Sequence, residues 1–337
     1  MKITTLILST AAVAALGLPA AAQTALRVQT HYAPETTSGK LAQEFVDQVA
    51  ADSNGDLTIE MFFSSSVVKT VEAFDAAVNG ILDCDMTGGA YQTGKNPAFQ
   101  FVGDIMGGYD TGEQQMDWLK QPGNMELVQD LYNQYGMRFI GWWMYGPESL
   151  ASTEPLNGIA DLKDWKFRSP PGMETEIFAA LGSSPVVMDF TEVFTALETG
   201  IIDGADASSL ANNQGMGLYD VASNGTYPGF HSMPADHLAC NQTKWESLTD
   251  EQRAVIQKAM DDLGAKSLKV HADANEAAVP VLTEAGVTLT EWSEEDRTEF
   301  REAAQTIWEQ WAQKTPETRA LVDSHVAYMK DLGLISE

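Results

Sequence analysis

Short apolar runs alternate with segments of helical periodicity along most of the chain. In the first third, apolar residues recur at helical spacing between Leu41 and Val49, and a short apolar run lies on either side. A strand, a helix and a second strand at this spacing predict a βαβ unit and a largely parallel sheet. The expected strands are residues 26–29, 57–63 and 81–86, and a second helix is expected over residues 71–80, ending at a glycine.

The same alternation begins again at residue 137. The run Met137–Met144 predicts an apolar strand, and an amphipathic helix is expected to begin at Thr191 and to end at Gly200. From Thr249 onward the pattern is helical almost throughout, and Thr249 to Gln252 has the form of a capped helix start. An α/β fold with two lobes and a helical C-terminal tail is therefore predicted. The other strands expected are residues 166–168, 185–188, 201–205 and 237–241, with a helix over 174–181.

The N-terminus has the pattern of a secretory signal. Lys2 precedes an apolar run over residues 6–18, and three alanines follow shortly afterwards. The run is shorter than the ~20 residues that a membrane span needs. We interpret residues 1–22 as a signal peptide that is cleaved before Gln23, which predicts a periplasmic mature protein.

Charge and cysteine content narrow the function classes. The 337 residues include 48 acidic and 20 basic side chains, a formal net charge of −28, which argues against binding nucleic acid or anionic lipid surfaces. Hydrophobic residues make up 44% of the chain, enough for about two domains with real cores. Cys84 and Cys240 are the two cysteines. In an exported protein they fit a disulfide and a pair of buried thiols equally well.

HExxH, GxSxG and CxxC motifs are missing from the sequence. The candidate binding residues that remain lie at the ends of predicted strands. Arg168 ends an apolar strand just before a Pro-Pro-Gly turn. Its planar guanidinium can form two hydrogen bonds with one carboxylate of a ligand. A surface ion pair explains the presence of this arginine equally well. Glu148 and Asp206 stand where strands give way to loops, as ligands of a hard cation do. Taken singly, each is also explained as a solvated or capping acid.

Together these segments resemble the solute-binding proteins of tripartite ATP-independent periplasmic (TRAP) transporters over nearly the whole mature chain. The most specific stretches are residues 166–172 (KFRSPPG), 192–204 (EVFTALETGIIDG) and 227–229 (YPG). Residues 90–99 (AYQTGKNPAF) are most similar to the branch that binds 2-oxo and 2-hydroxy monocarboxylates, in which a metal ion bridges protein and ligand.

The resemblance implies a type II-like periplasmic binding protein fold, in which two lobes joined by crossing strands close on a small organic acid. Such a protein passes its ligand to a membrane permease and is not an enzyme. The first lobe is expected to comprise residues 23–145 plus about 232–274, and the second about 146–231 plus 275–337. The C-terminal helices either form a homodimer or pack on their own lobe.

The resemblance also assigns site residues by position. Arg168 matches the arginine that grips the ligand carboxylate, and Tyr91 lies in the loop that lines the cleft. Asp206 matches an acidic metal ligand, and Ala207 the residue that offers its backbone carbonyl. Glu148 stands where the branch usually has a glutamine that touches metal and ligand. Two acids favour calcium as the cation, with sodium as the second choice.

The sequence departs from the branch at three places. Ala207 replaces a tryptophan and opens space beside the ligand, Glu148 adds a negative charge, and residues 230–232 (FHS) replace a string richer in tryptophan and acid. The last change puts any metal ligand from that loop in doubt. These departures equally fit a site without an ion, built for a larger acid. The alternatives are a receptor for a C4-dicarboxylate, a sulfonate or an aromatic acid and, in another class, an exported metal-dependent lyase that uses Glu148 and Asp206.

Overall fold

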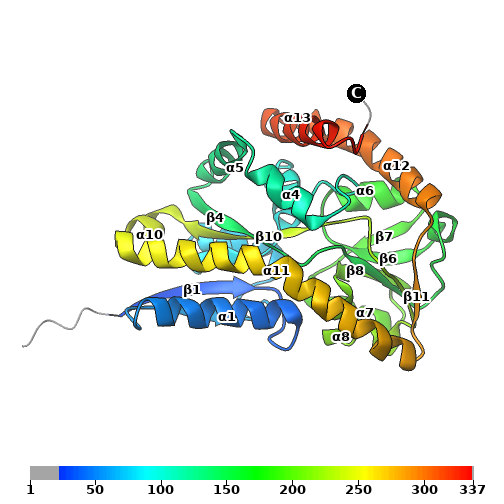
Figure 1. Ribbon diagram of the computed structural model, residues 1–337, viewed down its shortest axis with the longest axis horizontal. Coiled ribbons are helices and arrows are strands. Elements are labelled where there is room, and N and C mark those ends of the chain that lie inside the picture. Colours follow the sequence, from blue (N-terminus) through cyan, green and yellow to red (C-terminus); the bar gives the residue numbers. More distant parts are fainter. Residues whose placement is uncertain (1–22, 336–337) are drawn as a thin grey trace, which may run out of the picture.

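Two α/β lobes lie side by side in the computed structural model, which describes residues 23–335 (Figure 1). Each lobe is built around one mixed β-sheet, so the predicted two-lobed α/β fold is confirmed. The proposed signal peptide, residues 1–22, lies outside the described residues.

The sheet of the first lobe has the strand order β2-β1-β3-β10-β4. Strand β1 runs parallel to β2 and β3, whereas β10 runs antiparallel to β3 and β4. The strands are β1 (Thr24–Thr30), β2 (Leu57–Phe62), β3 (Cys84–Met86), β4 (Met137–Met144) and β10 (Ala235–Asn241). The helices of this part are α1 (Thr37–Asp52), η1 (Thr70–Glu72), α2 (Ala73–Val78), η2 (Gly89–Gln92), α3 (Phe99–Gly103), α4 (Gly112–Leu119), α5 (Asn124–Asn133) and α10 (Gln242–Glu246).

The sheet of the second lobe has the order β11-β9-β5-β8-β6-β7 and is also mixed. The expectation of a largely parallel sheet was wrong, because strands that enter from the other lobe run against their neighbours. The strands are β5 (Ser149–Ser152), β6 (Lys166–Ser169), β7 (Ser184–Val187), β8 (Gly204–Ser208), β9 (Asn224–Thr226) and β11 (Thr288–Thr290). The helices are η3 (Ile159–Leu162), α6 (Met173–Ala180), η4 (Phe190–Glu192), α7 (Val193–Glu198), α8 (Leu210–Gly215) and α9 (Leu218–Val221).

Two strands begin three residues later than the apolar runs 81–86 and 201–205 suggest. In both places a glycine with φ of 74° or 67° ends the preceding helix. The N–H groups of Ile81 and Ile201, which follow these glycines, donate back to helix carbonyls at 2.8 and 2.9 Å. Each isoleucine therefore belongs to a helix cap rather than to the strand.

Before its C-terminal helices, the described chain passes between the lobes three times. Residues 145–148 connect β4 to β5 and form the first crossing segment, and residues 227–234 connect β9 to β10 and form the second. Helix α11 (Asp250–Glu284) makes the third passage. Helix α11 packs against β4 and α1 in the first lobe and against α8 in the second (Figure 1). It begins at the predicted capping box, in which Thr249 and Gln252 exchange hydrogen bonds of 3.1 Å.

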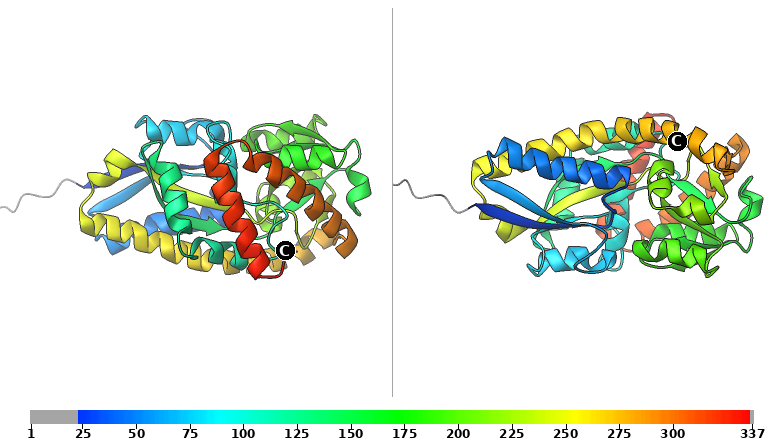
Figure 2. Two further views of the ribbon diagram at one scale, coloured as in Figure 1. Left: turned by 90° about the horizontal axis from the view of Figure 1, so that it is seen from above. Right: turned by 90° about the horizontal axis from the view of Figure 1, so that it is seen from below.

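The C-terminal helices pack on their own chain. Helix α12 (Glu294–Ala312) contacts α6 of the second lobe, and α13 (Pro316–Asp331) contacts α3 and α5 of the first (Figure 2). Trp292, Trp308 and Trp311 are all buried. The tail therefore packs across both lobes of its own chain.

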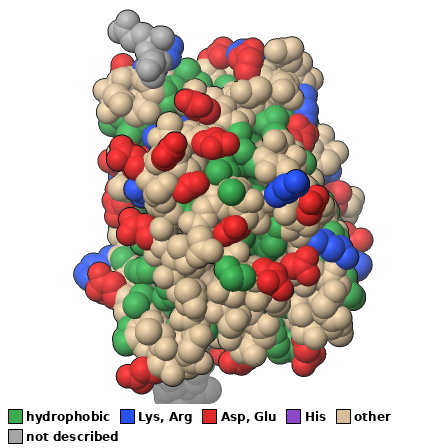
Figure 3. Space-filling model, turned by 90° about the vertical axis from the view of Figure 1, so that its right-hand side faces the viewer, with side chains coloured by type: hydrophobic (Ala, Val, Ile, Leu, Met, Phe, Trp, Pro, Cys, Tyr) green, Lys and Arg blue, Asp and Glu red, His purple; other side chains and the backbone are tan. Residues whose placement is uncertain are grey.

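The surface carries the acidic excess. On the face of the molecule shown in Figure 3, acidic side chains are scattered between hydrophobic and neutral ones, and basic side chains are fewer. None of the helices within residues 23–335 combines the length and the apolar character that crossing a membrane requires.

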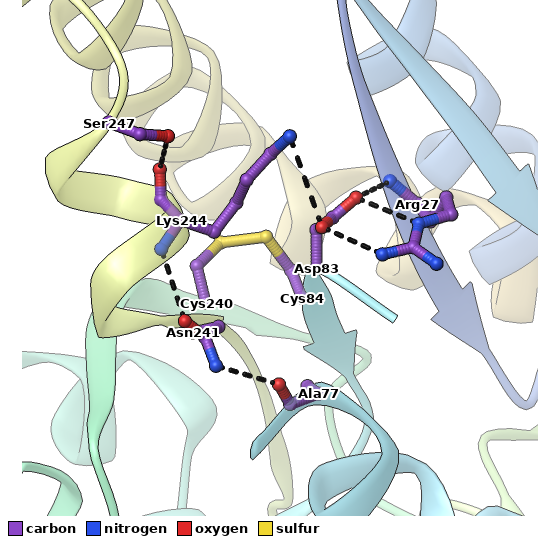
Figure 4. The surroundings of a disulfide bond; sticks show 8 residues. All are labelled: Arg27, Ala77, Asp83, Cys84, Cys240, Asn241, Lys244 and Ser247. Atoms are coloured by element: carbon purple, nitrogen blue, oxygen red, sulfur yellow. Dashed lines mark hydrogen bonds and ion pairs between the residues drawn. A yellow bond between two sulfur atoms is a disulfide. The ribbon is translucent and has the colours of Figure 1, made fainter. Parts of the chain in front are cut away.

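Cys84 and Cys240 form a disulfide that joins β3 to β10, where the two residues are register partners (Figure 4). Beside it, the carboxylate of Asp83 accepts a hydrogen bond from the guanidinium of Arg27 at 3.0 Å (Figure 4). The disulfide is thus the outcome of the two that the sequence left open.

We expect this disulfide to stabilise the fold, because it joins positions 156 residues apart and restricts the unfolded chain. The double substitution Cys84→Ser and Cys240→Ser should lower the free energy of unfolding by about 2–4 kcal/mol. Urea unfolding of oxidised and reduced wild-type protein, compared with the double variant, measures the effect. Two reactive thiols in the denatured, unreduced wild-type protein would contradict the assignment.

Candidate functional site

Arg168 lies at the boundary between the lobes, on strand β6 between β7 and β8. Its side chain is buried, and Nη1 donates a hydrogen bond to the carbonyl of Asp206 at 2.6 Å. From the first lobe, the hydroxyl of Tyr91 accepts a hydrogen bond from Nη2 at 3.4 Å. The partners of the guanidinium are carbonyl and hydroxyl oxygens rather than a carboxylate, so its charge stays available for an anion.

A cavity of about 50 Å³ opens beside Arg168 and is lined by both lobes. At roughly 10–15 Å³ for each water, it has room for about three to five water molecules. This size fits an organic acid of only a few heavy atoms. The predicted residues Tyr91, Glu148, Arg168 and Ala207 all line it.

Beside this cavity, three buried side chains come together from separate segments. Glu148 ends the first crossing segment, Asp206 lies in β8 and His231 lies in the second crossing segment. One possible ligand atom from each lies within 4.8 Å of the others. The Nε2 atom of His231 is 3.2 Å from Oδ2 of Asp206. The sequence predicted Glu148 and Asp206, and it left open whether residues 230–232 would contribute a ligand.

Further buried carboxylates face the same cavity and were not predicted from the sequence. Asp104 follows α3 and accepts a hydrogen bond of 2.6 Å from the hydroxyl of Ser232. Glu174 lies in the first turn of α6, and neither of its carboxylate oxygens has a hydrogen-bond donor among the described residues. Asp236, in β10, also lines the cavity. The sequence signal for Glu174 was its place directly after the Pro-Pro-Gly turn, whereas Asp104 had no such signal.

The carboxylates of the site differ in their affinity for protons. Burial, followed by the charge of Asp206, raises the pKa of both Glu148 and Glu174 well above the usual range. Burial also raises the pKa of Asp104 to about 7. Burial works against ionisation of Asp206 too, but His231, Glu174 and Arg168 together lower the pKa of this carboxyl. The buried acids therefore need protons or a cation to balance them.

Two glycines allow the segments of the site to approach one another. Gly229 lies so close to the first crossing segment that a Cβ atom would be 1.8 Å from the carbonyl oxygen of Glu148. Gly172 has a φ of 124°, and a Cβ there would lie 2.5 Å from the side-chain oxygen of Gln100 in the first lobe. The same oxygen of Gln100 accepts the N–H of Met173 at 3.0 Å, which ties the Pro-Pro-Gly turn to the opposite lobe.

A second contact between the lobes lies outside the cavity. The carboxylate of Asp189, just before η4, accepts the N–H of Thr70 at 3.0 Å, and Thr70 belongs to η1 of the first lobe. The ring of His31 lies edge-on to Phe190, with 4.7 Å between the ring centres. The two lobes are therefore in direct contact around Arg168.

The family model for "bacterial extracellular solute-binding protein, family 7" matches residues 28–315. The chain belongs to this family. Family 7 proteins are receptors rather than enzymes, and they work outside the cytoplasmic membrane with the permease components of TRAP transporters.

Curated relatives of this family 7 protein include receptors for different acids. It is 24% identical to the monocarboxylate 2-oxoacid-binding periplasmic protein of a Nostoc species, over 86% of this chain and 80% of the relative. It is 26% identical to the C4-dicarboxylate-binding periplasmic protein of Rhodobacter capsulatus, over 95% and 96% of the two chains.

Solved structures agree with this assignment. A TRAP periplasmic solute-binding protein from Rhodobacter sphaeroides, in an open form without ligand, is 34% identical with a TM-score of 0.72, over 93% of this chain and all of the other. A protein from Bordetella bronchiseptica with copurified calcium and picolinate shares the fold, with a TM-score of 0.85 at 22% identity, over 92% and 93% of the two chains. The interpretation from the sequence, a TRAP solute-binding protein for small organic acids, is confirmed.

Replacing Arg168 tests the centre of the site. Arg168→Ala should weaken binding of a small monocarboxylate such as pyruvate or lactate by at least about 100-fold, because two charge-assisted hydrogen bonds of about 1.5–3 kcal/mol each are lost. Calorimetric titration measures the affinity, and circular dichroism shows whether the variant folds. Lys166→Ala, two residues earlier on the same strand and exposed, is the matched control and should bind like wild type. Near-native affinity in folded Arg168→Ala protein would remove Arg168 from the site.

Proposed function

We propose that this family 7 protein captures a small 2-oxo or 2-hydroxy monocarboxylate together with a divalent cation, and delivers it in the periplasm to a TRAP permease. The observation that carries the proposal is the charge pattern of the cavity. Arg168 is the one cationic side chain among the described residues that line it, whereas Asp104, Glu148, Glu174 and Asp236 are acidic.

Arg168 binds the carboxylate of the ligand. A carboxylate loses its hydration when it enters a closed cavity, and this cost is acceptable only when the charge is paired and hydrogen-bonded. The guanidinium donates hydrogen bonds to the carbonyls of Asp206 and Met188, and these contacts fix its orientation without neutralising its charge. The guanidinium is therefore already oriented to form two parallel hydrogen bonds with one carboxylate.

Glu148 and Asp206 are the residues that would hold the cation. They approach each other near the cavity, and Oδ1 of Asp206 has no hydrogen-bond partner among the described residues. Two carboxylates, one of which has an oxygen without a hydrogen-bond partner among the described residues, suit a divalent ion, because hard divalent ions bind oxygen ligands. A bound cation supplies positive charge for the 2-oxo or 2-hydroxy oxygen of the ligand. The backbone carbonyl of Ala207 is the third ligand that we propose for it.

The same pattern disfavours a dicarboxylate. A second carboxylate on the ligand would face the acidic lining and would have no second arginine or lysine to pair with. The small volume also disfavours sugar acids. Although a relative named as a C4-dicarboxylate-binding protein covers nearly the whole chain, the charge of this cavity supports a single carboxylate.

The position of the lobes supports capture by closure. The Rhodobacter sphaeroides protein, open and without ligand, has a TM-score of 0.72 despite 34% identity. Ligand-bound proteins from Rhodoferax ferrireducens with malonate and Desulfovibrio salexigens with orotic acid reach 0.84 and 0.83 at 20% and 22% identity. We attribute the lower TM-score of the open protein to a different angle between its lobes. This difference supports a closed arrangement of the lobes in the present protein. A ligand that contacts both lobes only when they are closed drives closure through its differential affinity.

The number of carboxylates separates this proposal from its main alternative. Pyruvate or lactate at about a hundred times its dissociation constant should stabilise the protein by about 2.7 kcal/mol in the presence of divalent cations. Succinate and malate at the same concentration should give little stabilisation, because their second carboxylate would have no cationic side chain to pair with among the described residues of the cavity. Thermal unfolding with each acid measures the difference. Stronger stabilisation by succinate than by either monocarboxylate would overturn the ligand class.

Removing the cation should weaken binding of the acid at least about tenfold, because one contact of roughly 1.4 kcal/mol or more to the ligand is lost. The measurement is calorimetric titration with pyruvate or lactate after exhaustive chelation in sodium-free buffer, and again after adding back divalent ions. Arg168→Ala protein is the control and should not recover when ions are restored. Unchanged affinity after chelation would remove the cation from the proposed function.

A further inference from the structure

We infer that His231 is a direct metal ligand and that it selects a first-row transition metal ion over calcium. This inference rests on the proposed function, in which a divalent ion accompanies the acid, and it specifies the chemical class of that ion. The residues that carry it are Glu148, Asp206 and His231.

The distances between the side chains fit shared coordination. Nε2 of His231 lies 3.2 Å from Oδ2 of Asp206. Two donor atoms that each bind one metal at about 2.0–2.2 Å are about 2.8–3.1 Å apart at neighbouring positions of an octahedron and about 3.3–3.6 Å apart in a tetrahedron. Glu148 offers an oxygen within 4.8 Å of both atoms. With the carbonyl of Ala207 proposed above, two carboxylates and one imidazole make four protein ligands, and a six-coordinate ion keeps two positions for the two oxygens of a bidentate acid.

The fold holds the imidazole in place. The backbone carbonyl of His231 accepts the N–H of Gly107 at 2.7 Å, and the side chain is fully buried. Its ring lies edge-on to Phe178, Phe230 and Phe300, with ring centres 5.9, 5.6 and 6.2 Å away. These three apolar rings offer no acceptor that could draw the imidazole away from Asp206. Nδ1 of His231 has no hydrogen-bond partner among the described residues, so the packing of these rings and the contact with Asp206 orient the imidazole toward the acids.

The ligand types decide which ion fits best. Calcium prefers six to eight oxygen ligands and has little affinity for imidazole nitrogen. Imidazole suits zinc, iron, nickel and copper, and the affinity of mixed nitrogen and oxygen sites rises from manganese toward copper. Residues 230–232 are Phe-His-Ser, so this loop offers a nitrogen rather than a carboxylate. This donor set predicts a different ion from the calcium that copurified with the Bordetella bronchiseptica protein.

A simpler arrangement without metal is the competing explanation. In it, protonated His231 forms an ion pair with Asp206, and the imidazolium itself balances the buried acids. The two explanations differ in what the metal-free protein does when a transition metal is added. Only a ligand role gives tight binding and a nitrogen-containing coordination sphere.

The test uses metal-free mature protein, titrated separately with Co²⁺ and Ca²⁺. Calorimetry gives both affinities, and the visible absorption of Co²⁺ reports its ligands. We expect Co²⁺ to bind at least about 100-fold more tightly than Ca²⁺. His231→Gln should lower the Co²⁺ affinity at least about tenfold, shift the Co²⁺ absorption and leave Ca²⁺ affinity unchanged or higher, because an amide oxygen replaces the nitrogen.

His271→Gln is the matched control. His271 is also fully buried, but it lies on α11 and its ring nitrogen bonds the hydroxyl of Ser38 at 3.2 Å, away from the acids. This variant should keep the Co²⁺ affinity and spectrum of wild type, which shows that loss of a buried histidine alone does not remove the site.

Three results would overturn the inference. They are equal or tighter binding of Ca²⁺ by wild type, an unchanged Co²⁺ affinity and spectrum in His231→Gln, and no binding of Co²⁺ at all. In the first two cases the proposed function still holds if a divalent ion strengthens binding of pyruvate or lactate. If no ion changes the affinity for these acids, the cation part of the proposed function fails as well.

Discussion

A single buried arginine among several buried carboxylates is the constraint on which this site depends. Arg168 donates hydrogen bonds to the carbonyls of Asp206 and Met188, so no carboxylate of the described residues pairs with it directly. The acids around it need protons or a cation, because a buried charge without a partner is costly. In the function that we propose, an organic acid that arrives with a cation satisfies both requirements at once.

The two crossing segments bring residues of the site together at the boundary between the lobes. The first brings Glu148 to the boundary and the second brings His231, and Gly229 permits contact between them that no larger residue would allow. The N–H of Glu148 also donates to the carbonyl of Ser232 at 3.1 Å, which joins the segments directly. Two of the residues that we propose as ligands of the cation are therefore carried on the same segments that connect the lobes.

The sequence predicted the parts of this arrangement that depend on local patterns. The long apolar strand β4 and the capped start of α11 at Thr249 were located correctly, since apolar period and capping chemistry are local properties. Strands β5, β9 and β11 were missed, because each has only three or four residues and exists through pairing with distant strands. Arg168 was found from its place at a strand end, whereas Asp104 meets Ser232 across 128 residues of sequence, which no local pattern shows.

Helix α11 has a consequence for how the protein communicates with its permease. This one helix of 35 residues lies against both lobes, so neither lobe can turn freely about the other. A movement of one lobe relative to the other must therefore bend or shift this helix, which contains Pro280. A change in the angle between the lobes thereby reaches the outer surface, where a membrane partner can meet it without touching the cargo.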